Sequence, residues 1–369
     1  MIKIQKFIDE LKKNNLNFST GVPDSLFKNL CYGFETNFKK KSIIAANEGS
    51  AIAIGIGYYL SSKKIPIVYM QNSGLGNAIN PLISLADKKV YKIPIFLIIG
   101  WRGESKKKFK DEPQHLTQGL VTENFLKNLN IKYNIINNKS NFKKIIKKLC
   151  QKAKKNNEVV ALLVRKNTFE NKEDQKQNNS KHLLREQALD IIVKKIPDNS
   201  IIVSTTGILS RELNELIKKN NLKLRNFMCV GGMGHAISVA QGIAINKKNK
   251  VFCFDGDGSI TMHLGSLTTS SKQKNLIHIV FNNFSHESVG GHDNAAKHVK
   301  FFKLSKEIGY SQNYLCKNKK DILQSISSSL KSKKSSFIEI IIKKGHRKNI
   351  SRPKEKMLAL KNRFLRSIN

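Results

Sequence analysis

The chain has 369 residues, which is enough for two domains of ordinary size that each bury a core. Its formal net charge is +39, which could suit a nucleic-acid partner. However, only nine of the 66 basic residues are Arg, and the lysines are spread along the chain without an aromatic-basic stripe. We therefore expect no nucleic-acid partner. The five cysteines form no C-x-x-C pair and suit a reducing compartment, and no apolar run approaches the roughly 18 residues of a membrane span, so we expect a cytoplasmic location and no membrane partner.

The first half of the chain alternates helix and strand patterns. The apolar residues of 1–13 recur at helical spacing, which predicts an amphipathic helix rather than a signal peptide. An Ala/Ile/Gly-rich helix is expected over 47–60. Alternation of this kind predicts a parallel, doubly wound sheet. The expected strands lie at 18–25 (ending in a turn), 42–46, 65–70, 93–99 and 158–164.

A polar stretch over 167–183 has almost no apolar side chains and is typical of a linker. The predicted organisation is therefore a first domain over 1–166, the linker, and a second domain over 184–369, each an α/β unit with a doubly wound parallel sheet and no middle domain between them. No simple internal repeat is visible, although both halves show the same alternation of helix and strand patterns. The elements expected in the second half are strands at 200–204, 227–230, 251–254, 276–281 and 337–342, and helices at 209–218 and 236–246.

The most informative stretch is 251–286, where polar residues follow two apolar runs. The first run leads into DGDGS at 255–259, and the second ends in NN at 282–283. Because ligands bind beyond the carboxyl ends of parallel strands, we expect Asp257 and Asn283 to converge. A carboxylate and an amide oxygen suit Mg²⁺, and the two glycines would let backbone N–H groups approach a diphosphate. The plainer alternative is an ordinary strand–turn–strand unit.

This stretch resembles the diphosphate and Mg²⁺ motif of thiamine-diphosphate-dependent enzymes. The resemblance implies thiamine diphosphate and Mg²⁺ as cofactors, with the metal held by Asp257, Asn283 and the backbone carbonyl of Ser285. Mn²⁺ stays open, since it takes similar oxygen ligands. The four G-x-G pairs of the chain lack the third glycine of a dinucleotide fingerprint, so no nicotinamide or flavin is expected. The residues of this stretch that the resemblance assigns to the cofactor are Gly256, Asp257, Gly258, Ser259 and Asn283.

Glu48 stands just after a predicted short strand, at the start of the Ala/Ile/Gly-rich helix. In this family a Glu in that context hydrogen-bonds a pyrimidine nitrogen of the cofactor and drives its tautomerisation. The resemblance therefore implies that Glu48 is catalytic. Taken alone, a Glu in the first turn of a helix is a solvated carboxylate favoured by the helix dipole, and that alternative stays open.

Two further turns match the family's cofactor site. Met233, inside GGMGH at 231–235, stands where the family has a bulky apolar side chain between the two cofactor rings, with core packing as the alternative. Because Glu48 and the Mg²⁺ motif lie in different halves, the resemblance also implies a homo-oligomer, at least a dimer, with active sites between subunits. The residues of these turns assigned to the cofactor are Thr206, Gly207, Gly231, Gly232, Met233 and Gly234.

The short chain lacks the middle domain of many family members, which narrows the resemblance to compact decarboxylases. Its pattern is most similar to members that decarboxylate 3-phosphonopyruvate to phosphonoacetaldehyde and CO₂ in phosphonate biosynthesis. The alternative is a sulfopyruvate decarboxylase, or another enzyme of the same fold that decarboxylates or ligates a 2-oxo acid. The Lys-rich segment 105–110 departs from the pattern. The motifs that carry the similarity are GVPDS at 21–25, QNSGLGN at 71–77, GWRG at 100–103, DEPQH at 111–115 and SVGG at 288–291.

Such a small-molecule substrate needs a proton relay and a cationic group for its phosphonate. We expect Asp24 and His115 to be catalytic, because His titrates near neutrality and Asp can share its proton. Arg102, together with His115, is the candidate for substrate binding, because a planar guanidinium matches phosphonate oxygens. The alternatives are a helix cap for Asp24, a surface loop for His115 and a structural ion pair for Arg102. Weaker candidates are His286, His292 and Lys297.

Overall fold

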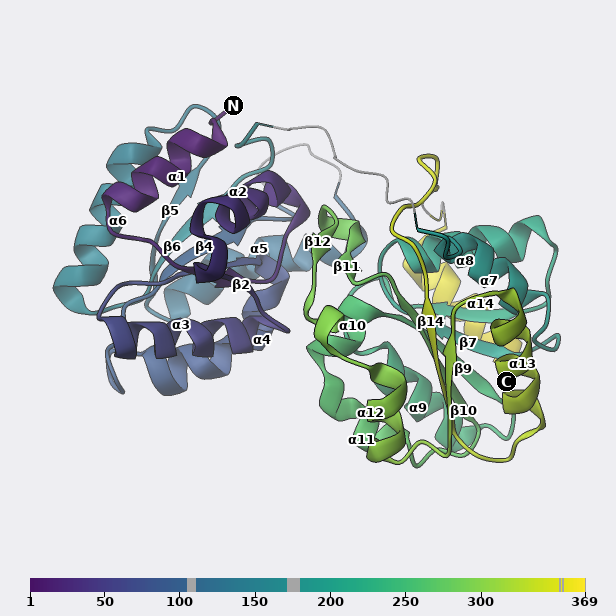
Figure 1. Cartoon of the computed structure of the whole chain (residues 1–369). Helices are drawn as coiled ribbons and strands as arrows, with labels where there is room; N and C mark the ends of the chain where they lie inside the picture. The colour runs from purple at the N-terminus through teal and green to yellow at the C-terminus, as the bar shows by residue number, and fades with distance from the viewer. Residues whose placement is uncertain (105–110, 171–179, 352, 354, 369) are drawn as a thin grey trace. The chain divides into compact units, whose positions relative to one another are not determined.

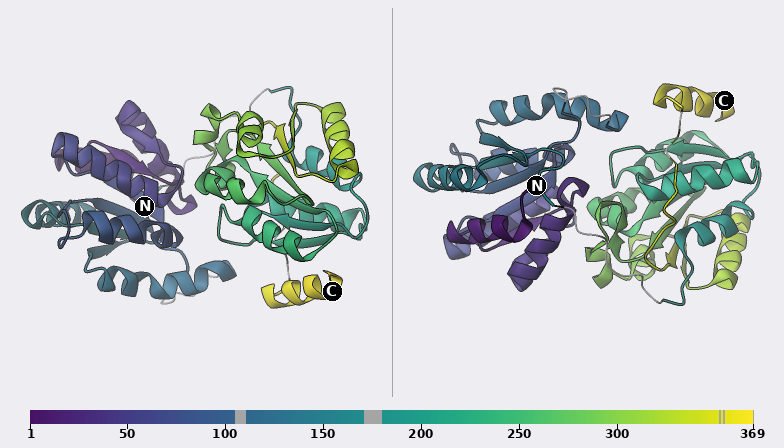
Figure 2. Two further views of the ribbon diagram at one scale, coloured as in Figure 1. Left: turned by 90° about the horizontal axis from the view of Figure 1, so that it is seen from below. Right: turned by 90° about the horizontal axis from the view of Figure 1, so that it is seen from above.

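The computed structural model describes residues 1–104, 111–170, 180–351, 353 and 355–368 (Figure 1). The chain divides into two compact units, Met1–Gln175 and Lys176–Asn369. Each unit is built on one six-stranded parallel sheet with helices on both faces (Figure 2). The predicted fold class, two doubly wound parallel sheets, is therefore confirmed, and no middle domain is evident among the described residues.

The sheet of the first unit has the order β2-β1-β3-β4-β6-β5. The strand order reverses between β1 and β3, so the loops after these strands border the crevice where ligands bind in such sheets. Strands β3, β4 and β6 are apolar and buried almost throughout, as parallel strands covered on both faces are. The strands are β1 (Ser19–Gly21), β2 (Ser42–Ile44), β3 (Ile67–Gln71), β4 (Phe96–Gly100), β5 (Lys132–Ile136) and β6 (Val160–Val164).

The first sheet buries a different set of helices on each face. α1, α2 and α6 pack on one face, and α3, α4 and α5 pack on the other. The predicted N-terminal helix is α1, and its apolar residues Ile4, Phe7, Ile8 and Leu11 are all buried, each stabilising the unit by about 1.5–3 kcal/mol. The helices are α1 (Ile4–Lys13), α2 (Lys28–Phe38), α3 (Glu48–Ser62), α4 (Leu75–Pro81), α5 (Pro113–Asn128) and α6 (Phe142–Asn156).

The sheet of the second unit has the order β13-β14-β10-β9-β7-β8. When strands are numbered within each unit, both sheets have the order 2-1-3-4-6-5, so the two units share one topology. The loops after β7 and β9 therefore border the second crevice, as those after β1 and β3 border the first. The strands are β7 (Ile201–Ser204), β8 (Arg225–Met228), β9 (Val251–Gly256), β10 (Leu276–Asn282), β13 (Gln312–Cys316) and β14 (Ser336–Ile341), with a short antiparallel pair, β11 (Ser285–His286) and β12 (His292–Asp293).

Helices α7, α8 and α13 pack on one face of the second sheet, and α9, α11 and α12 pack on the other. The C-terminal α14 joins that second face through Phe364, whose ring centroid lies 5.4 Å from that of Phe227. None of the helices in the described parts of the chain has the length and apolarity to cross a membrane. The helices are α7 (Arg185–Val193), α8 (Ile208–Lys219), α9 (Ala236–Asn246), α10 (Asp257–Met262), α11 (Leu267–Ser270), α12 (Phe301–Ile308), α13 (Lys319–Lys331) and α14 (Met357–Ile368).

The sequence analysis missed the short antiparallel pair β11 and β12, and it missed one strand in each six-stranded sheet, β5 in the first and β13 in the second. β5 and β13 each form one edge of a six-stranded sheet, and most of their residues are half-buried. An edge strand has a neighbour on one side only, so it tolerates polar residues such as Asn134 and Asn313. The apolar run that announces a central strand is therefore missing from both segments.

The segment predicted as a linker begins with packed residues. The N–H of Ile2 donates to the Thr168 carbonyl at 2.8 Å, and Phe169 is buried against Phe7 with 4.9 Å between ring centroids. The packed part of the first unit thus extends a few residues past the predicted boundary at 166. Two stretches lie outside the described residues, namely 171–179 of the predicted linker and the Lys-rich segment 105–110.

Candidate active site

Asp257 is the first residue of α10, directly after β9, and its side chain is buried. Its Oδ2 accepts hydrogen bonds from the backbone N–H of Ser285 at 2.9 Å and from the side-chain amide of Asn294 at 3.0 Å. Burial raises the pKa of Asp257 to about 6, although these two hydrogen bonds lower it. A buried carboxylate of this kind is stabilised in its charged form by a bound cation.

Asn283 meets Asp257 from the end of the neighbouring strand β10. The Ser285 N–H that binds Asp257 also donates to Asn283 Oδ1, at 3.0 Å. The two side chains predicted to bind the metal therefore lie within hydrogen-bond distance of one backbone nitrogen. The preceding Asn282 points into the unit instead, where its amide donates to Glu339 at 2.8 Å. The structure thus brings together the two residues that the sequence separates by a strand and a helix.

The surroundings of these oxygens fit a hard cation beside a phosphate group. Carboxylate and amide oxygens are suitable Mg²⁺ ligands, and the hydroxyl of Ser285 is buried with no hydrogen-bond partner among the described residues. At Gly256 an added Cβ would meet none of the described atoms within 4 Å, so the backbone there is open to a ligand. Gly258 instead packs on His286, whose Nδ1 would lie 2.7 Å from such a Cβ. For the carbonyl of Ser285, the predicted role as a metal ligand rests on the family resemblance alone.

Ser259 ties together the turns that follow β7, β8 and β9. Its hydroxyl lies 2.9 Å from that of Thr205 and accepts the N–H of Gly234 at 3.0 Å. Gly234 has a φ of +90°, a conformation that other residues rarely adopt. The hydroxyl of Thr206 donates to the Val230 carbonyl at 2.9 Å, which joins the first two turns again. The predicted cofactor residues Thr206, Gly234 and Ser259, which follow three separate strands, are therefore held together.

The remaining predicted cofactor residues lie in the same turns. Gly207 has a φ of +100° just before α8, and a side chain there would meet the hydroxyl of Ser288. Gly232 is exposed, and Gly231 and Met233 are half-buried. Met233 is thus not one of the buried core residues of the second unit, which weakens the core-packing alternative.

Glu48 begins α3, and Asn47 caps this helix by accepting the N–H of Ser50 at 2.8 Å. The Glu48 side chain is buried, at 5% exposure, so the solvated-carboxylate alternative does not hold. Burial raises its pKa, and a 2.7 Å hydrogen bond donated by the Asn77 side chain lowers it. A buried carboxyl with a raised pKa is suited to proton exchange with a ligand nitrogen.

Glycines make room for Glu48 and for the loop beside it. A Cβ at Gly74 would lie 2.4–2.6 Å from three atoms of the Glu48 side chain. A Cβ at Gly49 would lie 2.8 Å from the Asn77 carbonyl oxygen. The start of α3 and the loop after β3 therefore approach each other closely, and this approach brings the Asn77 amide to the carboxylate.

Asp24 follows β1 and is fully buried. Its Oδ1 accepts the N–H of Leu26 at 3.2 Å and caps the helical turn Ser25–Phe27, as the helix-cap alternative predicts. Its Oδ2 is buried against Gly100 and has no hydrogen-bond partner among the described residues. Burial raises the pKa of Asp24 to about 6, and the charge of Arg102 lowers it. The cap thus uses one oxygen and leaves the other available for chemistry.

Arg102 follows β4, and its guanidinium lies beside this turn. One Nη donates to the Ser25 hydroxyl, and the other lies 3.3 Å from Asp111 Oδ1, which matches the ion-pair alternative. The Nε–H of Arg102 is buried and has no hydrogen-bond partner in the described parts of the chain. A buried guanidinium donor of this kind is suited to an anionic ligand.

His115 lies in α5 and is buried at 9% exposure, so the surface-loop alternative is wrong. Its Nδ1 lies 3.3 Å from the side-chain oxygen of Gln118. Burial and the charge of Arg102 lower the pKa of His115, whereas the charge of Asp111 raises it. Since the charge of Arg102 lowers the pKa of both Asp24 and His115, the three residues predicted for proton transfer and substrate binding belong to one electrostatic cluster.

The weaker candidates lie in the second unit. His286 is buried, and burial followed by the charge of His292 lowers its pKa to about 4, so it is neutral near pH 7. The two histidines face each other across β11 and β12. Lys297 is exposed and pairs with Asp293 at 3.3 Å, which places it on the surface of this unit.

On β9 and β10, just before Asp257 and Asn283, three fully buried side chains lie together. The ligand-type atoms of Cys253, Asp255 and His278 are within 4.8 Å of one another. Asp255 Oδ1 accepts the N–H of Gly256 at 2.9 Å, and its Oδ2 lies 3.5 Å from the His278 ring. These contacts anchor the end of β9, which Asp257 directly follows.

Three polar residues near the site received no role in the sequence analysis. Asn77 contacts Glu48, Asn294 contacts Asp257, and Glu287 accepts a hydrogen bond from Asn283 at 3.2 Å. Asn77 stands inside QNSGLGN, and the other two follow the NN pair within twelve residues. Their position near these motifs was the available signal, but their partners follow only from the fold.

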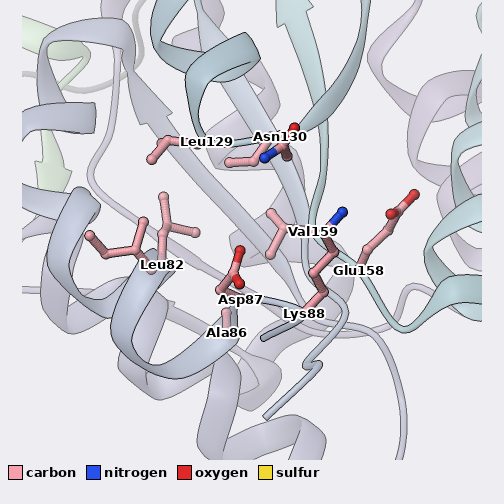
Figure 3. A pocket seen from close by; sticks show the side chains of 10 residues that line it. Leu82, Ala86, Asp87, Lys88, Leu129, Asn130, Glu158 and Val159 are labelled. Atoms are coloured by element: carbon pink, nitrogen blue, oxygen red, sulfur yellow. The ribbon is translucent and has the colours of Figure 1, made fainter. Parts of the chain in front are cut away.

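A small pocket of about 30 Å³ in the first unit contains none of the predicted site residues (Figure 3). Glu158 and Val159 line it and immediately precede β6, so it opens at the amino ends of the strands. The candidate residues stand at the carboxyl ends. This volume has room for a water molecule but not for a 2-oxo acid.

Two domain families match the chain. The thiamine pyrophosphate enzyme N-terminal TPP binding domain matches residues 4–129, and the C-terminal TPP binding domain matches residues 206–340. The chain therefore belongs to the thiamine pyrophosphate enzymes, and the two family matches fall on its two α/β units in turn.

Within this class the chain is a thiamine-pyrophosphate-dependent decarboxylase, a lyase, because its full-length relatives are decarboxylases. It is 28% identical to a phosphonopyruvate decarboxylase of Streptomyces viridochromogenes, over 93% of this chain and 89% of that protein. It is 24% identical to a sulfopyruvate decarboxylase of Methanosarcina acetivorans, over 93% and 92%. A sulfopyruvate decarboxylase subunit alpha of Methanococcus maripaludis is 35% identical over 32% of this chain and 68% of that subunit.

Proposed function

We propose that the enzyme converts 3-phosphonopyruvate to phosphonoacetaldehyde and CO₂ in phosphonate biosynthesis, with thiamine diphosphate and Mg²⁺. The observation that supports this substrate is the environment of Arg102. Its buried Nε–H has no hydrogen-bond partner among the described residues, and its guanidinium lies beside the turn that contains Asp24. A phosphonate offers the anionic oxygens that such a donor binds. The full-length similarity to a phosphonopyruvate decarboxylase supports the same choice.

The cofactor, when bound, supplies the nucleophilic carbon and the electron sink for decarboxylation. Asp257, Asn283 and the carbonyl of Ser285 would hold Mg²⁺, and the turns that Ser259 joins would hold the diphosphate. Met233 would pack between the cofactor rings, and Glu48 would hydrogen-bond the pyrimidine. Asp24, with its pKa raised by burial to about 6, and His115 would move the proton that replaces CO₂.

We further propose that residues 1–166 form the pyrimidine domain and 184–369 the diphosphate domain, and that the enzyme is at least a homodimer. The family resemblance supports this organisation, with the site assembled between subunits. Mixing two inactive variants tests it directly. Glu48→Gln and Asp257→Ala subunits, combined after dissociation, should recover activity if each site takes Glu48 from one subunit and Asp257 from the other.

The deciding experiment is CO₂ release by purified protein with both cofactors, with phosphonopyruvate, sulfopyruvate and pyruvate offered in parallel. A clear preference for phosphonopyruvate supports the proposal, provided that Glu48→Gln loses this activity while it retains cofactor. A preference for sulfopyruvate supports the second candidate, which the Methanosarcina relative favours through its equally complete coverage of this chain. No turnover with any of the three would overturn both.

A further inference from the structure

We propose that Glu287, held by Arg185, is a positioning residue that sets the orientation of the Asn283 side chain and so keeps its amide oxygen available to Mg²⁺. The inference rests on the proposed metal site. It concerns a residue that touches neither metal nor substrate and acts through the ligand beside it.

An asparagine can serve as a magnesium ligand only through its oxygen. Its Oδ1 and Nδ2 have nearly the same shape, so contacts must decide which of them faces Asp257. Here Nδ2 of Asn283 donates to Glu287 Oε2 at 3.2 Å, and Oδ1 shares the Ser285 N–H with Asp257. An ionised carboxylate only accepts hydrogen bonds, so Glu287 disfavours the flipped amide, whose oxygen would face it.

Glu287 is itself held on both sides. Its Oε2 accepts a 2.8 Å hydrogen bond from Arg185 Nη1, and its Oε1 accepts the N–H of Gly345. Its side chain is 10% exposed. The carboxylate therefore has little freedom to turn away from Asn283, and its charge is compensated by a guanidinium at direct contact.

Arg185 is fixed in turn by a second carboxylate. Its Nε donates to Glu212 at 2.7 Å, and its Nη2 donates to the same group at 3.3 Å. Arg185 and Glu212 are both almost fully buried. The result is a chain of charge-assisted hydrogen bonds from α8 through the first residue of α7 to the end of β10, and only Glu287 within it contacts the proposed metal ligand.

This arrangement supplies a matched control. Glu212 and Glu287 both bind Arg185, but only Glu287 reaches Asn283. Removing a partner that orients a metal ligand weakens metal binding by about 10–100-fold. We therefore expect Glu287→Ala to raise the Mg²⁺ dissociation constant by this factor, whereas Glu212→Gln lowers the thermal unfolding temperature with little effect on that constant.

The measurement is calorimetric titration of Mg²⁺ into the full-length protein at saturating thiamine diphosphate, with thermal unfolding of each variant alongside. Should Glu287→Ala not fold, the pair Asn283→Asp and Asn283→Asp/Glu287→Gln replaces it. The amide introduced at position 287 can donate a hydrogen bond to the carboxylate introduced at position 283, so the double variant should bind Mg²⁺ more tightly than the single one.

The inference is overturned by unchanged Mg²⁺ affinity in Glu287→Ala, by equal weakening in Glu212→Gln, or by a double variant no better than Asn283→Asp. A wild-type protein that binds no Mg²⁺ with thiamine diphosphate refutes the metal site itself, which is a separate outcome.

Discussion

Replacing Gly74 by alanine should displace Glu48 without disturbing the fold that carries it. The added Cβ would lie 2.4, 2.5 and 2.6 Å from Cγ, Oε1 and Cδ of Glu48. Since carbon contacts are ordinarily about 3.5–4.0 Å, the side chain must retreat by about 1 Å. It then loses the 2.7 Å hydrogen bond from Asn77. Gly74 has a φ of −70°, so alanine causes no backbone strain of its own.

A displacement of about 1 Å in a reacting group can cost about 100-fold in rate, and we expect kcat for CO₂ release to fall by this factor. Overpacking should lower the free energy of unfolding by about 1–3 kcal/mol, which urea denaturation measures. The variant should therefore remain folded and bind cofactor while it loses turnover.

Gly76→Ala, two residues further on in the first turn of α4, is the matched control. A Cβ there would meet no atom of the described residues within 4 Å, so this variant should keep wild-type turnover. Wild-type kcat in Gly74→Ala would refute the reasoning, because it would mean that the position of Glu48 does not matter to the reaction. Equal losses of kcat in both glycine variants would point to the start of α4 rather than to Glu48.

Three further predictions test other parts of the site. Asp24→Asn should raise the free energy of unfolding by about 2 kcal/mol more at pH 7 than at pH 4. Burial raises the pKa of the wild-type carboxyl from 3.8 to about 6, so the wild-type protein loses stability as pH rises through that interval. A gain in urea denaturation that does not vary with pH would contradict this. Asp257→Ala should weaken Mg²⁺ binding at saturating thiamine diphosphate by more than about 100-fold, because loss of a ligand costs more than loss of a residue that only orients one. An unchanged Mg²⁺ titration would exclude Asp257 as a ligand. Arg102→Lys should raise KM for phosphonopyruvate about 10-fold. Lysine cannot reproduce the planar fork of the guanidinium, and the loss of one charge-assisted hydrogen bond costs about 1.5 kcal/mol. A fall in kcat at unchanged KM would mean that Arg102 acts in the chemical step and not in substrate binding.

Local patterns in the sequence were sufficient for the central strands and for the turns that end them. A short, continuous apolar run predicts a parallel strand that is buried on both faces, and β9 and β10 are strands of this kind. Because ligands gather at the carboxyl ends of such strands, Asp257 and Asn283 could be paired before any contact between them was known. Their common contact with the Ser285 N–H agrees with that pairing.

Alternatives that depended on burial were decided by the tertiary structure. A helix-start Glu, an Asp after Pro and a His near a loop have the same local sequence whether they are solvated or enclosed. Glu48 is enclosed because the loop after β3 approaches at Gly74, and Asp24 because Gly100 lies against its Oδ2. These contacts join residues 26 and 76 positions apart, which no local pattern encodes.

The sequence by itself determined the fold class, the positions of the central strands along the chain and the resemblance that led to the cofactor, since each depends on short-range periodicity or on a contiguous motif. Only the tertiary structure revealed the shared topology of the two sheets, the edge strands β5 and β13, and the partners Asn77, Asn294 and Glu287. The physical reason is that hydrogen-bond partners and desolvation are properties of neighbours in space, and the crossovers of a doubly wound sheet bring distant segments together at its carboxyl edge.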